Sequence, residues 1–121
     1  MLYSVLIYGL ESEVAALSAE QEKTLLAQHE VVQKKLKMER KLGPVVRLMP
    51  TTAAVTIRKG GEPVILDGPF AETKEQLLGL YVLDCPSLDE AIEGAQLIGT
   101  ACNSRSLEIR PISWFGSGQA S

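Results

Sequence analysis

Two capping-box sequences limit what this chain can fold into, because they begin its only two long helical segments. Residues 18–21, Ser-Ala-Glu-Gln, predict a helix from Ala19 to about Lys41, closed by Gly43-Pro44. Residues 87–90, Ser-Leu-Asp-Glu, predict a second helix that runs to about Gly99. Two helices cannot cover both faces of a mainly antiparallel sheet. The sequence therefore predicts an α+β fold in which one sheet face carries no helix.

Short apolar segments, rich in β-branched and aromatic residues, predict the strands of that sheet. Two of them are joined across Lys59-Gly60-Gly61-Glu62, which favours a hairpin. The order β-α-β-β-β-β-α-β indicates a ferredoxin-like layer with the hairpin as an addition. We expect a homodimer formed through the bare sheet face. The predicted strands are Leu2–Tyr8, Val45–Leu48, Ala53–Arg58, Val64–Leu66, Leu77–Asp84 and Leu107–Ile112.

Length and composition exclude several classes of protein. The 121 residues predict one domain, residues 1–115, followed by a flexible tail at 116–121. Twelve basic and 15 acidic residues give a net charge of −3, which argues against nucleic-acid and anionic-membrane partners. Two cysteines, Cys85 and Cys102, are too few for a disulfide scaffold. The apolar start has no basic region and ends after ten residues, so we predict a cytoplasmic protein without a membrane segment.

Residues 67–75 read DGPFAETKE, an uninterrupted match that resembles the signature of the DGPF branch of the YCII-related family. Weaker similarities to this family cover nearly the whole chain, from the first strand to the last. The resemblance implies a dimeric α+β barrel, in which two ferredoxin-like sheets pack face to face. It also implies one candidate site per subunit, formed by His29 and Asp67. Related proteins of this broader fold include proton-transferring enzymes, and many family members are associated with extracytoplasmic-function sigma factors.

His29, the single histidine, lies in the apolar row of the first predicted helix, with Leu25 and Val32. An imidazole facing a sheet needs a hydrogen-bond partner, and Asp67 follows directly after an apolar strand. A His29–Asp67 pair would raise the histidine pKa and make a general base. The residues leave a second interpretation open, in which His29 is a satisfied core residue and Asp67 caps its own turn.

Three further residues are candidates for contact with a substrate. Pro69 and Phe70 would form the rim of a pocket, although the same residues also suit a purely structural turn. Tyr3 and Tyr8 lie five residues apart and so on opposite strand faces, which leaves at most one for a pocket; we assign Tyr8. The spacing of the one histidine and two cysteines matches no zinc site, and no cofactor motif is present.

Two functions follow from these features. The first is a small cofactor-independent enzyme that moves a proton on a small metabolite, as a lyase, isomerase or dehalogenase does, with His29 as the base and Asp67 orienting it. The second is a non-catalytic dimer that senses a ligand or binds a partner, linked to sigma-factor regulation. The enzyme is the first choice, because a buried His–Asp pair is a costly way to make an interaction surface.

Overall fold

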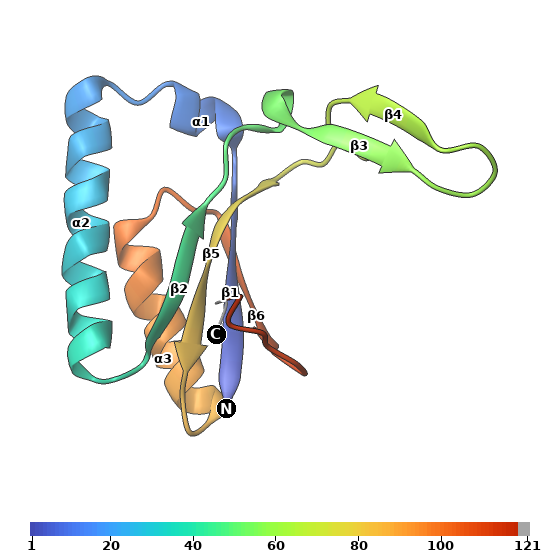
Figure 1. The fold of residues 1–121 in the computed structure, drawn as a ribbon. Coiled ribbons are helices and arrows are strands. Elements are labelled where there is room, and N and C mark those ends of the chain that lie inside the picture. The colour runs from blue at the N-terminus through green and yellow to red at the C-terminus, as the bar shows by residue number, and fades with distance from the viewer. Residues whose placement is uncertain (119–121) are drawn as a thin grey trace.

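Four strands form one antiparallel sheet in the order β2-β5-β1-β6, and two long helices lie side by side on one of its faces (Figure 1). The computed structural model describes residues 1–118, so the last three residues of the predicted tail lie outside the described part. The α+β class is confirmed. The described residues of one chain form an open sheet rather than a closed barrel. The strands are β1 (Leu2–Gly9), β2 (Leu42–Arg47), β5 (Gln76–Asp84) and β6 (Ser106–Pro111).

Alternation along β1 separates the two faces of the sheet. Tyr3, Val5 and Ile7 are buried, whereas the residues between them are only partly so. Cross-strand partners share a face, and Val5 pairs with Tyr81 of β5. The buried side chains of this face pack with those of α2 (Ala19–Met38) and α3 (Leu88–Ala101) to form the core. The predicted opposite orientation of Tyr3 and Tyr8 is confirmed.

Helix α2 begins where its sequence signal predicts but ends earlier than predicted. The predicted capping box is present, with the Ser18 side chain accepting from the Gln21 N–H at 3.1 Å. The predicted end at Lys41 is wrong, because Arg40 adopts a left-handed φ of 61° and ends the helix. Lys41 N–H then donates to the Leu36 carbonyl at 2.9 Å. Gly43 and Pro44 lie inside β2 instead of closing the helix.

A hairpin extends from the end of the sheet, on the side away from α2 and α3 (Figure 1). It consists of β3 (Val55–Arg58), a turn and β4 (Val64–Asp67), and we name residues 55–67 the arm. The predicted hairpin is confirmed. Its turn needs glycine, because Gly60 and Gly61 have φ of 101° and 90°. A short 3₁₀ helix, η1 (Thr51–Ala53), precedes the arm.

A short helix that the sequence analysis did not predict, α1 (Glu11–Ala15), fixes both roots of the arm. The two carboxylate oxygens of Glu11 accept hydrogen bonds from Thr51, one from its backbone N–H at 2.5 Å and one from its hydroxyl at 2.6 Å. The backbone N–H of Glu11 donates to the Gln76 side chain at 3.0 Å. Residues on both sides of the arm are therefore tied to the same point of the fold.

The contact between β2 and β5 predicts the effect of a substitution at Gly79. A Cβ atom there would lie 2.4 Å from the Val46 backbone carbonyl oxygen, which cannot move without disturbing the sheet. We expect Gly79→Ala to lower the free energy of unfolding by about 2 kcal/mol. The matched control is Gly99→Ala in α3, whose Cβ would meet only the flexible Leu107 side chain. Urea unfolding of both variants measures the difference; equal stability would contradict this account of β2–β5 packing.

Candidate functional site

A cavity of about 530 Å³ lies between α2 and the sheet. It exists because α2 has buried side chains only in its C-terminal half, at Val32 and Leu36. The N-terminal half lines the cavity with Leu25, and His29 lines it from the middle of the helix. The opposite wall comes from β2 and β5, and most of the lining is aliphatic. The volume falls within the range of about 300–1,000 Å³ that is typical of small-molecule sites.

Three polar side chains meet at the wall of this cavity. His29 and Gln33 lie one turn apart on α2 and both face Tyr81 of β5. The Nδ1 atom of His29 is 2.6 Å from the Tyr81 hydroxyl, and Nε2 of Gln33 donates to the same hydroxyl at 3.2 Å. The rings of His29 and Tyr81 stack with their planes 24° apart. Tyr81 itself is buried against Val5 and Val45 of the neighbouring strands.

The second ring nitrogen of His29 is the atom open to a ligand. Among residues 1–118, no hydrogen bond occupies Nε2 of His29. Nδ1 is engaged with Tyr81. In the neutral imidazole, Nε2 carries the ring proton when Nδ1 lacks it, and has a free lone pair when Nδ1 holds it. The tyrosine contact therefore orients the imidazole, the role that the sequence analysis gave to Asp67.

Burial lowers the pKa of His29, and the positive charge of Arg47 lowers it further. The raised pKa that the sequence analysis expected depends on a His29–Asp67 pair, and it stays a prediction for an assembly that forms this pair. Burial raises the pKa of the Tyr81 phenol, although the hydrogen bond from Gln33 partly offsets this effect. At neutral pH both partners of the His29–Tyr81 pair are consequently uncharged.

Arg47 is the basic side chain of the cavity lining, and it forms an ion pair with Glu22. The pair links β2 to the N-terminal half of α2 across the cavity. Arg47 lowers the pKa of Glu22 through this hydrogen bond, and Glu22 raises that of Arg47. Both side chains are partly exposed, so an ion pair of this kind contributes little to stability. A ligand carboxylate could compete with Glu22 for the guanidinium.

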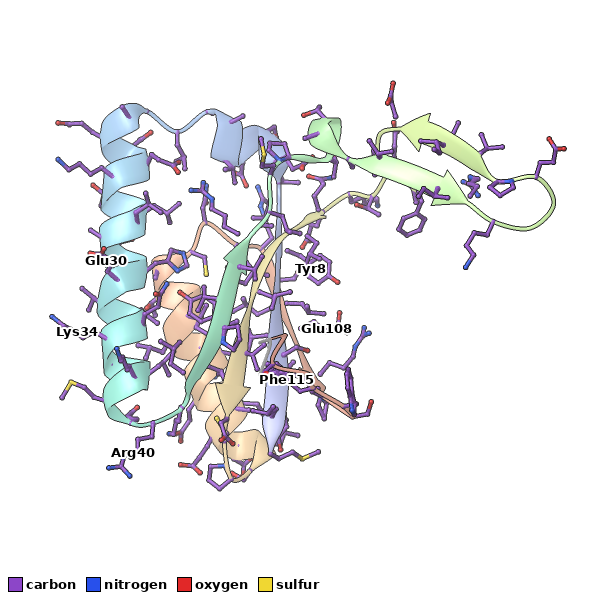
Figure 2. All side chains as sticks on the ribbon, viewed as in Figure 1. Tyr8, Glu30, Lys34, Arg40, Glu108 and Phe115 are labelled. Atoms are coloured by element: carbon purple, nitrogen blue, oxygen red, sulfur yellow. The ribbon has the colours of Figure 1, made fainter. Side chains whose placement is uncertain are left out.

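Asp67, Pro69 and Phe70 lie on or beside the arm, are exposed, and do not line the cavity. Asp67 pairs through its backbone with Val55, and among the described residues no hydrogen bond or ion pair joins it to His29. Figure 2 shows Tyr8 with Glu108 on the sheet face away from the helices, so Tyr8 does not line the cavity either. Of the predicted site residues, one chain thus brings only His29 to the cavity.

Tyr81, Gln33 and Arg47 are the polar residues that the sequence analysis missed. Gln33 had a usable signal, because it lies four residues after His29 and so on the same helix face. Tyr81 lies in an apolar strand, which favoured a core role. Its contact with His29 spans 52 positions and depends on tertiary packing.

In residues 1–118, no group of three or more His, Cys, Asp or Glu side chains is placed to hold a metal ion. No helix in the described part of the chain combines the length and the apolar character needed to cross a bilayer. Cys85 and Cys102 are both free thiols.

The lowered pKa of His29 predicts how stability depends on pH. The unfolded chain binds a proton at its ordinary pKa of 6.5, where folded His29 stays neutral, so stability falls as the pH drops through this value. The loss is at most about 1.4 kcal/mol per pH unit for one proton. Urea unfolding of the wild type and His29→Gln between about pH 7.5 and 5.5 isolates this effect. An equal pH dependence of the two proteins would contradict it.

The charge of Arg47 predicts the direction of a shift in the His29 titration. Arg47→Met removes the nearby cation and leaves the Glu22 carboxylate unpaired, and both changes should raise the pKa of His29. Because His29 is the single histidine, its ring protons can be followed by NMR without ambiguity. The control is Arg110→Met, which removes an arginine that pairs with Glu108 on β6. A pKa that is unchanged or lowered in Arg47→Met would refute this electrostatic assignment.

The matches to known proteins cover nearly the whole of the fold described above. Residues 1–115 match the model of the YCII-related domain. An uncharacterized protein of Rhizobium meliloti (strain 1021) is 49% identical over 121 residues, which covers 98% of each chain. The chain belongs to the YCII-related family.

Proposed function

We propose that this protein is a cofactor-independent enzyme that transfers a proton on a small, mostly apolar metabolite, with His29 as its acid–base residue. One observation carries the proposal: a neutral imidazole is held by Tyr81 through Nδ1, while Nε2 is left open at the wall of an apolar cavity. A group whose pKa lies near or below neutrality is unprotonated at physiological pH and can accept a proton.

The His29–Tyr81 contact supports two proton arrangements. In one, the Tyr81 hydroxyl donates to Nδ1, so the proton of the neutral imidazole is on Nε2, which can donate a hydrogen bond to a ligand oxygen. In the other, Nδ1–H donates to the Tyr81 oxygen and the lone pair of Nε2 can take a proton from carbon. Both arrangements keep the bond between the two side chains. His29 can thus remove a proton from one ligand atom and return it to another.

Among the described residues, Arg47 is the basic member of three charged side chains in the lining; Glu11 is engaged with Thr51, so a ligand carboxylate would bind at Arg47 by displacing Glu22. Arg47 can bind that carboxylate, while the aliphatic walls bury the rest of the molecule. The negative charge of the ligand would also offset the effect of Arg47 on His29. Binding should therefore raise the pKa of His29 and strengthen it as a base once the substrate is in place.

We further infer membership of the DGPF branch, from residues 67–75, and a ferredoxin-like homodimer formed through the open sheet face. The strand order β2-β5-β1-β6 with both long helices on one face supports this fold. On the open face, Val46, Leu80 and Leu6 form one row across three strands. A second sheet packed there would cover this aliphatic row. A His29–Asp67 contact stays a prediction that requires such an assembly.

The second candidate is a binding protein without turnover, linked to sigma-factor regulation as the resemblance implies. The exposed apolar arm favours it, because such a surface is typical of interaction proteins. This candidate uses the same cavity, so its ligand would raise the pKa of His29 without undergoing reaction. A test of proton transfer itself separates the two candidates.

Exchange of carbon-bound hydrogen for deuterium tests proton transfer before the substrate is known. The protein is incubated in D₂O with a panel of small carboxylic acids that have a C–H bond next to a carbonyl group. We expect at least one compound to lose its C–H signal in the proton NMR spectrum. His29→Gln should slow this exchange by about 10²–10⁴-fold, since it removes the base.

Two variants complete this experiment. Tyr81→Phe keeps the ring but removes the hydroxyl that orients His29, so we expect a smaller loss than in His29→Gln. Arg110→Met on β6 serves as the control and should exchange at the wild-type rate. Exchange that persists unchanged in His29→Gln would refute the proposed base. Binding without exchange across the panel would support the second candidate.

A further inference from the structure

The arm exposes aliphatic side chains along its whole length. Ile57 and Ile65 are cross-strand partners on one face and are 62% and 70% exposed, and Val55 beside them is 60% exposed. Val64 and Leu66 are exposed on the opposite face, so the two faces of the arm together leave on the order of 500 Å² of apolar surface in water. The cavity chemistry proposed above uses none of these residues.

An isolated two-stranded hairpin is at best marginally stable in water. The arm forms a sheet of its own, and no strand of the main sheet pairs with it. Its ladder therefore lacks the packing that normally stabilises β-structure. A defined hairpin of this composition requires a surface that covers its apolar face.

The chain's own sheet cannot supply that surface. Glu11 holds Thr51 on the way into the arm and Gln76 on the way out, so the direction of the arm is fixed at both roots. Figure 1 shows the arm extending away from the helix layer rather than folding back over the open sheet face. A preorganised arm of this kind binds another molecule at a reduced entropic cost.

A second copy of the chain offers a surface of matching chemistry. Its open sheet face presents the aliphatic row of Val46, Leu80 and Leu6, on which the proposed sheet-face contact forms, so an arm that extends past this contact meets the same copy. Two-fold symmetry lets each copy give an arm and receive one, so a single closed interface covers both apolar surfaces of both chains. The Val55, Ile57 and Ile65 face adds apolar area to the sheet-face contact, and a stable interface needs about 800 Å² from each partner.

The charge and the length of the arm both agree with a second copy of the chain as its binding partner. The arm carries Arg58 and Lys59 against Glu62 and Asp67, so it is electrically balanced and two copies do not repel each other through it. From Val55 to its turn the arm reaches roughly 20 Å at strand geometry, whereas packed sheets lie about 10 Å apart. An arm of this length extends past a sheet packed on the open face.

We propose that the arm, residues 55–67, clasps a second copy of this chain and packs its Val55, Ile57 and Ile65 face against that copy. The inference rests on the homodimer proposed above and adds a second contact to the sheet-face interface. In this assembly the DGPF segment, residues 67–70, lies at the subunit boundary, because it begins at the last residue of the arm.

Hydrogen exchange and sedimentation of the intact chain test the clasp. In the wild type, we expect the backbone amides of residues 55–67 to gain protection as the protein concentration rises through the dimerisation midpoint. The double variant Ile57→Asp/Ile65→Asp places four charges in the interface of the dimer and should weaken dimerisation at least about 100-fold. Both isoleucines are exposed in the single chain, so its fold should be retained in circular dichroism.

Val31→Asp on α2 is the matched control, because Val31 is 69% exposed and lies far from the arm in sequence. It should dimerise like the wild type. A dimer whose arm amides exchange rapidly at every concentration, with no effect of the double variant, would overturn the clasp and leave the sheet-face dimer standing. A wild-type chain that stays monomeric at every concentration tested would overturn both.

Discussion

The unequal covering of the sheet is the constraint on which the rest of this structure depends. Only α2 and α3 are long enough to cover a four-stranded sheet, and both lie on the same face. The core is therefore built from one set of alternating strand residues, such as Val5 and Tyr81, and from α3 and the C-terminal half of α2. The other face keeps an aliphatic row, Val46, Leu80 and Leu6, on the side of the sheet that carries neither of the two long helices.

The same packing creates the cavity. α2 is anchored at Val32 and Leu36, and its N-terminal half stands off from the sheet. An imidazole at the boundary between the anchored and free halves is buried enough to have a lowered pKa, yet remains open to a ligand. Tyr81 reaches this boundary because its strand lies in the middle of the sheet, between β1 and β2. Fold and site are thus two consequences of one helix–sheet contact.

Most of the fold could be predicted because its signals are local. The Ser18 capping box, the alternation of β1 and the Gly60-Gly61 turn each act over a few residues. The failures were also local in origin. Gly43-Pro44 resembled a helix stop, but the left-handed Arg40 ended α2 first and left both residues to β2. The short helix α1 has no side-chain cap at its start, so nothing in the sequence marked it.

The sequence by itself determined the α+β class, the position of the arm in the chain and the orientation of His29 toward the sheet, because periodicity and turn residues encode these features. Only the tertiary structure decided which side chain His29 meets. Strand register placed Tyr81, which lies 52 positions after His29, opposite α2. Glu11 held the roots of the arm, so that Asp67 at the end of the arm lies away from the cavity. Contacts of this kind depend on how distant segments pack, and no local pattern specifies them.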